Sequence, residues 1–151
     1  MKTKLTPEQQ KRADTLARMT PTEWDAVCKQ CGICCMTKME IPGILLDDNA
    51  GPIYLKQCCE NFDTKTCKCS IYQTRFSKNP FCEKVDMDII LEGKLLPASC
   101  GYVEYIFGPA QHPAKVDFSQ VCPVPYDIKL TTEQIIKDAI PESVLWNKYG
   151  R

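Results

Sequence analysis

The stretch Cys28-Lys29-Gln30-Cys31-Gly32-Ile33-Cys34-Cys35 places four thiols within eight residues. Seven more cysteines follow it along the chain: Cys58, Cys59, Cys67, Cys69, Cys82, Cys100 and Cys122. Packing alone does not require eleven cysteines in 151 residues. Their spacing points first to metal binding, because soft thiolates suit zinc, iron–sulfur clusters and copper(I).

Two overlapping Cys-x-x-Cys steps run through the stretch, from Cys28 to Cys31 and from Cys31 to Cys34. Such spacing lets two thiolates approach one ion from a tight turn. Gly32 supplies the backbone freedom that the turn needs. Cys35 follows Cys34 directly, and neighbouring side chains diverge. The pair is therefore expected either to serve two metals, or to supply one ligand and one buried thiol.

A ferredoxin-type motif, disulfides and simple burial fit the cysteines less well than metal binding does. A bacterial ferredoxin run reads C-x2-C-x2-C-x3-C-P, but this chain has Lys38 and Met39 where that run ends in Cys-Pro. Disulfides are not expected, because eleven is odd and the first residues contain no apolar secretory signal. Burial as a small hydrophobic residue is expected for about two or three of the cysteines.

Composition predicts a single domain over residues 1–151 with a hydrophobic core of its own. Lysine plus arginine and aspartate plus glutamate number 19 each, with no basic stripe, so nucleic acid is not the expected partner. No apolar run approaches the length that crosses a bilayer, so no membrane partner is expected either. We expect a soluble, cytoplasmic protein with reduced thiols.

The fold class that the sequence predicts is α+β and irregular, with short helices and a few short strands around a cysteine-rich metal-binding centre. Helices are expected at 7–19 as a loosely docked arm, from Thr20 to near Cys28, over 87–92, and from Thr131 onward. Short strands are expected at 44–46, 53–55 and 103–107, and the segment 122–125 is expected to be extended and irregular.

The later cysteines add candidate ligands. Cys67 and Cys69 are two residues apart, so an extended chain would present both thiols on one side. Arg75 is expected to donate to a thiolate cluster or a carboxylate, with a surface ion pair as the equal alternative. His112 is the only histidine, and in a proline-flanked loop it is expected to be structural or exposed. No catalytic triad and no phosphate-binding glycine loop is recognisable, so whether the protein is an enzyme stays open.

The chain resembles the YkgJ/YcgN-like cysteine cluster family, whose signature is CxxCxxCC and which is described as a zinc- or iron-chelating domain. The matching positions are Trp24, the Cys28–Cys35 stretch, Ile53-Tyr54, Cys59, Thr66-Cys67-x-Cys69, Tyr72, Arg75, Pro80-x-Cys82, Leu96-Pro97-x-x-Cys100-x-Tyr102 and, more weakly, His112-Pro113. The departures are Val103 and Gln111, where members of the YcgN type carry arginine and tryptophan.

The resemblance implies a metal-binding core at 20–113, between the helical arm at 1–19 and a helical cover at 114–151. The ligand pool that it implies is Cys28, Cys31, Cys34, Cys35, Cys59, Cys67, Cys69, Cys82 and Cys100. Cys58 and Cys122 are extras.

Three functions follow as hypotheses. The first is an iron–sulfur protein with a redox or accessory role, in which eight thiolates hold two clusters and Cys34 and Cys35 direct one ligand to each. The alternative is a structural zinc module whose surface binds a protein partner of unidentified kind. The third is a component of a cluster-dependent enzyme. The number of thiols favours iron–sulfur over zinc.

Overall fold

The computed structural model describes residues 4–39, 53–79, 82, 84–92, 96–111, 113–125 and 127–140. The expected strand at 44–46 and His112 lie outside these residues. They contain short helices and small sheets of two and three strands. The predicted α+β class is therefore confirmed.

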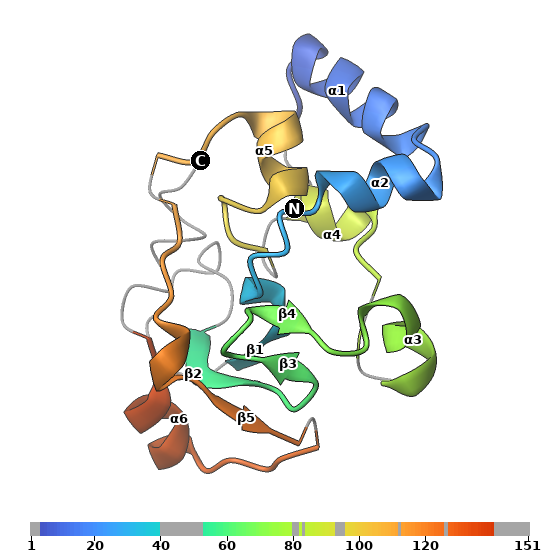
Figure 1. Cartoon of the computed structure of the whole chain (residues 1–151). Helices are drawn as coiled ribbons and strands as arrows, with labels where there is room; N and C mark the ends of the chain where they lie inside the picture. Colours follow the sequence, from blue (N-terminus) through green and yellow to red (C-terminus); the bar gives the residue numbers. More distant parts are fainter. Residues whose placement is uncertain are drawn as a thin grey trace.

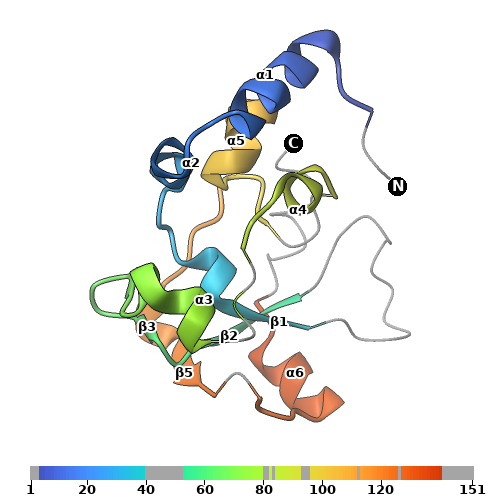
Figure 2. The same cartoon turned by 90° about the vertical axis from the view of Figure 1, so that its right-hand side faces the viewer.

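Four helices make one part of the molecule, at the top of Figure 1. They are α1 (Pro7–Ala17), α2 (Pro21–Val27), α4 (Met87–Glu92) and α5 (Gly101–Phe107). Figure 2 shows the same grouping from the side. The predicted helix starts are confirmed, since Thr6 and Thr20 each form a complete capping box with the residue three positions later.

The sheets make the other part. One sheet has the order β1-β2-β5, with β1 (Met36–Met39) antiparallel and β5 (Cys122–Val124) parallel to the central β2 (Ile53–Cys59). A second sheet pairs β3 (Phe62–Asp63) with β4 (Lys68–Cys69). The helices α3 (Arg75–Lys78) and α6 (Thr132–Asp138) also belong to this part (Figure 1). Thr131 caps α6 with a third capping box, as predicted.

Each part has its own hydrophobic core. The helical core contains Ala13, Leu16, Ile90, Leu96, Tyr102, Val103 and Ile106. The sheet core contains Ile33, Met36, Tyr54, Cys58, Phe62 and Val121. The 28–35 stretch joins the two, because Cys28 packs against the helical core while Ile33 and Cys35 pack with the sheet core. The thiols of this stretch are thereby held between the two cores.

Three structural expectations were wrong. Residues 103–107 form part of α5 rather than a strand, because Tyr102, Val103 and Ile106 bury one helical face. The segment 122–125 is not wholly irregular, because Cys122–Val124 adds a parallel strand to β2. The first helix is not loosely docked, because Leu16 is fully buried against the helical core.

Candidate metal centre

The turn after α2 positions the first thiols. Cys28 is the C-terminal cap of α2, and the backbone N–H of Gln30 donates to its Sγ at 3.4 Å. Gln30 and Gly32 both have positive φ, at 52° and 79°. A Cβ on Gly32 would lie 2.4 Å from the ring of Phe62, so this position needs glycine for space as well as for conformation. The backbone bends at Gly32, within the stretch where the sequence predicted a turn.

Cys34 and Cys35 sit in a single 3-10 turn over Ile33–Cys35, and each thiol shifts the pKa of the other. The hydrogen bond from Cys35, aided by the nearby cations of Lys38 and Arg75, lowers the pKa of Cys34 to about 6. The same hydrogen bond and burial raise the pKa of Cys35. The pair therefore holds one thiolate near neutral pH.

The sulfur of Cys59, at the end of β2, accepts three hydrogen bonds. Its Sγ accepts from the backbone N–H of Asn61 at 3.5 Å, from the side-chain amide of Asn61 at 3.7 Å and from that of Asn79 at 3.6 Å. Asn79 also accepts the backbone N–H of Cys82 through its carbonyl at 3.1 Å. Amide donors aimed at sulfur stabilise a thiolate and are typical of metal-ligating cysteines.

Cys67 does not share this environment with Cys69. It has φ of 56° and lies before the two-residue strand β4, so the extended geometry expected for the pair is absent. Its thiol donates to the carbonyl of Thr64 at 3.7 Å, and its side chain packs against the sheet core.

Cys100 reaches the site from the helical part, as the residue that precedes α5. A Cβ on the next residue, Gly101, would lie 2.1 Å from the carbonyl oxygen of Val27. The absence of a side chain at Gly101 therefore lets the start of α5 touch the end of α2. Burial raises the pKa of Cys100 to about 11, although the amides of Val103 and Tyr102 oppose the rise.

Two cations face the thiols. Burial lowers the pKa of Lys38, and the nearby thiols of Cys34, Cys35 and Cys82 oppose this shift. The ammonium group of Lys38 donates to the carbonyls of Cys34 and Met36 at 2.8 and 3.1 Å. Arg75 stacks over the rings of Tyr72 and Phe76 at 4.0 and 4.2 Å and donates to the Tyr72 carbonyl. Its charge contributes to the lowered pKa of Cys34, and it opposes the rise that burial causes in the pKa of Cys82, so of its predicted roles the structure places it near thiols.

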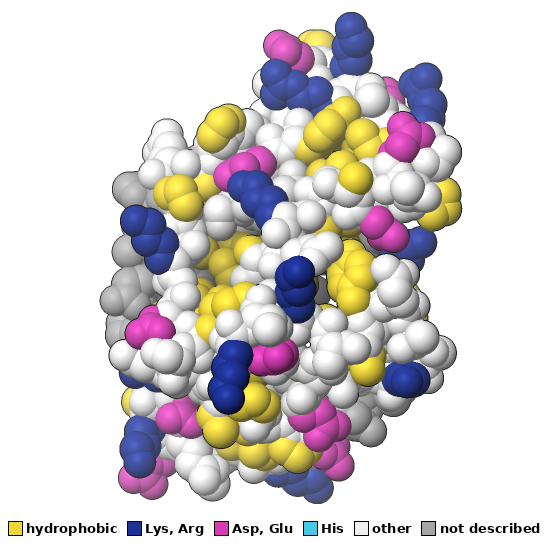
Figure 3. Space-filling model, in the orientation of Figure 1, with side chains coloured by type: hydrophobic (Ala, Val, Ile, Leu, Met, Phe, Trp, Pro, Cys, Tyr) yellow, Lys and Arg dark blue, Asp and Glu magenta, His cyan; other side chains and the backbone are white. Residues whose placement is uncertain are grey.

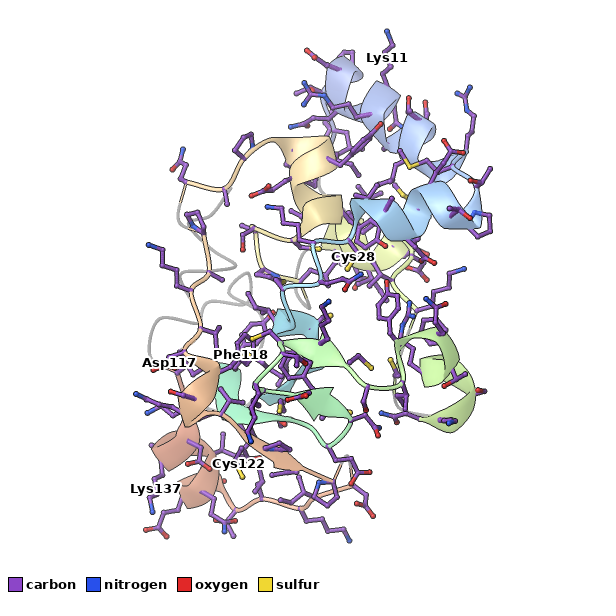
Figure 4. All side chains as sticks on the ribbon, viewed as in Figure 1. Lys11, Cys28, Asp117, Phe118, Cys122 and Lys137 are labelled. Carbon is purple, nitrogen blue, oxygen red and sulfur yellow. The ribbon has the colours of Figure 1, made fainter. Side chains whose placement is uncertain are left out.

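A cavity of about 870 Å³ brings these groups together between the two parts of the molecule. Its wall includes the cysteines Cys28, Cys34, Cys35, Cys58, Cys59, Cys69 and Cys82, together with Lys38 and Arg75. Figure 3 shows hydrophobic side chains, a class that there includes cysteine and tyrosine, gathered beside a hollow at the middle of this face. Figure 4 shows Cys28 near this middle zone and Cys122 well below it, on β5.

Of the nine cysteines in the predicted ligand pool, six therefore line one cavity. Cys31 and Cys100 are not on its wall, but the charge of Cys34 contributes to the raised pKa of each. Every cysteine is a free thiol. Within the described ranges, no group of three Cys, His, Asp or Glu side chains is already arranged to hold a metal ion. The thiols surround a common space without converging on one point.

Sequence reasoning missed three residues at this site. In the sequence, Lys38 stands out only as a departure from the ferredoxin run, and no motif singles out Asn61 or Asn79 as donors to Cys59. Their positions close to cysteines in the chain were the only available signal.

The fold and this cavity define a class: a small α+β protein whose free cysteines cluster around one cavity. The chain belongs to the UPF0260 family. It is 32% identical to a UPF0260 protein of Shewanella denitrificans over 139 residues, which cover 87% of this chain and 91% of that one. It is 37% identical to a Pseudomonas putida member over 91 residues, which cover 60% of this chain and 57% of that one. It is 35% identical to a Rhizobium etli member over 92 residues, which cover 60% of this chain and 54% of that one. The names of these relatives state the family alone.

No family model matches the chain. No solved structure matches it either. Among the described residues, no helix has the length and apolar character needed to cross a membrane.

Cys34 is expected to be the first cysteine alkylated in the reduced, metal-free chain. Its side chain is exposed and its lowered pKa makes it a thiolate near neutral pH, whereas Cys58 is fully buried with its pKa raised to about 11. Because the lowered pKa is about 6, its rate should rise between about pH 5 and 7 and then level off. Timed iodoacetamide labelling with peptide mass analysis measures this. Modification of Cys58 before Cys34 would contradict the electrostatics of the pair.

Replacing Gly101 with alanine is expected to separate α5 from α2. The new methyl group meets a backbone carbonyl at 2.1 Å, which only a backbone shift relieves. Such overpacking costs about 1–3 kcal/mol of unfolding free energy, measurable by urea denaturation. Gly108→Ala is the comparison, since a Cβ there meets nothing within 4 Å and only the positive φ of 89° opposes it. A Gly101→Ala protein as stable as the wild type would show that this close approach is not needed.

Proposed function

We propose that the protein binds metal through cysteine thiolates at this cavity, with an iron–sulfur cluster as its cofactor and a redox or accessory role. The observation that carries the proposal is the gathering of seven cysteines on one cavity wall with two cations beside them. Such a cluster, when bound, supplies one-electron transfer. The likeness to the CxxCxxCC cysteine cluster family supports the same proposal.

The residues around the cavity fit a metal centre that is bound by cysteine thiolates. Four thiolates around a metal carry a strong negative charge, which is costly to desolvate unless it is balanced. Lys38 and Arg75 supply two positive charges at the thiols. The amide donors of Asn61 and Asn79 on Cys59 would further hold negative charge on sulfur and tune a reduction potential.

The size of the cavity favours a cluster over a single ion. A volume of about 870 Å³ falls in the range of about 300–1,000 Å³ that protein pockets for whole molecules occupy. A zinc ion bound by four thiolates is enclosed directly by its ligands. A cluster of several iron and sulfide atoms fills more of the same space.

Structural zinc is the second candidate. The tight turn in which Gln30 N–H donates to Cys28 Sγ at 3.4 Å suits a tetrahedral thiolate site as well. In this case the protein would be a module whose surface binds a protein partner. Both candidates place the protein in a reducing compartment such as the cytoplasm, because all eleven cysteines are free thiols.

Anaerobic purification followed by elemental analysis and a visible spectrum tests the proposal. We expect a coloured protein that contains iron and acid-labile sulfide. Colourless protein with whole-number zinc would establish the second candidate instead. Protein that takes up neither iron with sulfide nor zinc after anaerobic reconstitution would overturn metal binding.

A further inference from the structure

We infer that Lys29 and Glu104 are positioning residues for metal binding, because their ion pair holds the turn from Cys28 to Cys31 against the start of α5. Lys29 is one of the two residues between these cysteines. Its ammonium lies 2.6 Å from a carboxylate oxygen of Glu104, which is on α5. This inference rests on the proposed metal-binding function and adds two charged residues that place thiols without binding the metal themselves.

Glu104 is fixed to the helical turn that follows Cys100. Its backbone N–H donates to the Cys100 carbonyl at 2.9 Å, and its own carbonyl accepts the N–H of Gly108 at 2.8 Å. The carboxylate oxygen that does not meet Lys29 accepts the backbone N–H of Ala110 at 3.3 Å. Only 21% of the Glu104 side chain is exposed. The carboxylate is therefore held by the protein in the orientation that meets Lys29.

Lys29 lies over the same start of α5. A Cβ on Gly101 would lie 2.1 Å from the carbonyl oxygen of Val27 and 3.4 Å from the Cγ of Lys29. The residues on both sides of Cys28 therefore closely approach the residue that follows Cys100. Cys28 and Cys100 also pack against the same helical core. The ion pair adds a contact across this junction from within the turn itself.

The ion pair joins residues that are 75 positions apart in the chain, so it fixes the turn relative to α5. Ordering a mobile turn costs conformational entropy, and that cost weakens binding of the metal that orders it. A turn that Lys29 and Glu104 already hold in place requires less ordering. Because 48% of the Lys29 side chain is exposed, water screens the pair, and we expect it to contribute up to about fivefold in metal affinity.

Titration of the reduced, metal-free full chain with Co²⁺ tests the inference, since thiolate-to-cobalt absorption reports the thiolate-bound ion and gives its affinity. Glu104→Gln and Lys29→Met are each expected to weaken cobalt binding by up to about fivefold. Glu104→Lys places two like charges together and should weaken binding further. The exchange Lys29→Glu/Glu104→Lys restores opposite charges, so it should recover most of the affinity that Glu104→Lys loses.

Glu8→Lys is the matched control. Glu8 pairs with Arg12 at 2.8 Å within α1, where the ion pair spans only four residues. The substitution changes the net charge by the same amount as Glu104→Lys, so it measures how far added positive charge alone weakens cobalt binding. It should leave the cobalt affinity close to that of the wild type. Circular dichroism of each metal-free variant separates an effect on the turn from loss of the fold, and Glu104→Gln and Lys29→Met keep the test valid if Glu104→Lys does not fold.

The outcomes separate this inference from the proposed function. Glu104→Gln and Lys29→Met that bind cobalt as tightly as the wild type would overturn the inference. So would an exchanged pair that recovers none of the affinity lost in Glu104→Lys, or a loss in Glu8→Lys equal to that in Glu104→Lys. If the wild type gives no thiolate–cobalt absorption, the metal-binding proposal itself fails.

Discussion

Serine at both Cys34 and Cys35 is expected to remove almost all bound metal. Both thiols line the cavity at which metal binding is proposed. Loss of an outer-shell partner alone typically costs about 10–100-fold in metal affinity, so loss of two thiolate ligands should cost at least about 100-fold. Metal content per chain after anaerobic purification, with Co²⁺ affinity as a second readout, measures the effect.

The matched control is the double variant Cys67→Ser/Cys122→Ser, which also replaces two cysteines with two serines. Both thiols lie outside the cavity wall, so this protein should keep the metal content of the wild type. Equal metal loss in the two double variants would contradict metal binding by the thiols of the cavity, because it would mean that thiol number matters and position does not.

Replacing Leu16 with alanine is expected to cost about 2–5 kcal/mol of unfolding free energy. Its side chain is fully buried in the helical core, so truncation leaves a cavity that the helices fill only in part. The same change should weaken any metal binding in which Cys100 takes part, because α1 packs on α5 and Cys100 precedes α5. Urea denaturation of metal-free protein isolates the packing effect, and Co²⁺ titration then measures the effect on metal binding.

Ile136→Ala removes a branched aliphatic side chain from an exposed position on α6, where 56% of the residue is accessible. It should change stability by about 0.5 kcal/mol or less. If Leu16→Ala were no more destabilising than this control, α1 would be the loosely docked arm that its few apolar positions suggested.

Local signals in the sequence predicted the helix starts well. Thr6, Thr20 and Thr131 each precede a capping-box partner, and all three helices begin there. A cap is a short-range interaction, so its residues are visible in a window of four. The short helix that the sequence predicted over 87–92 begins with a similar contact, because the backbone N–H of Ile89 donates to the Asp86 carboxylate at 2.9 Å.

Long-range packing decided the elements that were predicted wrongly. Val103, Tyr105 and Ile106 favour strands by propensity, yet the chain buries Tyr102, Val103 and Ile106 against the helical core as a helix. The strand at Cys122–Val124 depends on its pairing with β2, more than sixty residues earlier. No local pattern reveals such a pairing.

The candidate site shows the same contrast between local signals, which the sequence reveals, and long-range packing, which it does not. Spacing singled out Cys28, Cys31, Cys34 and Cys35, and the tight turn with positive φ at Gly32 is present. The grouping of these thiols with Cys100 or Cys82 depends on how Gly101 and Asn79 place distant segments. The cation Lys38 reaches the thiols only because the chain folds back after the 3-10 turn. These features depend on tertiary contacts that the sequence does not reveal.

X-ray absorption at the metal edge of the anaerobically purified full chain tests metal binding by these cysteines most directly, because it reports the atoms bonded to the metal. Thiolate ligation predicts a first shell of sulfur alone, at about 2.3 Å, with a neighbouring iron in the second shell when clusters are bound. A first shell dominated by oxygen or nitrogen would contradict thiolate binding by these cysteines.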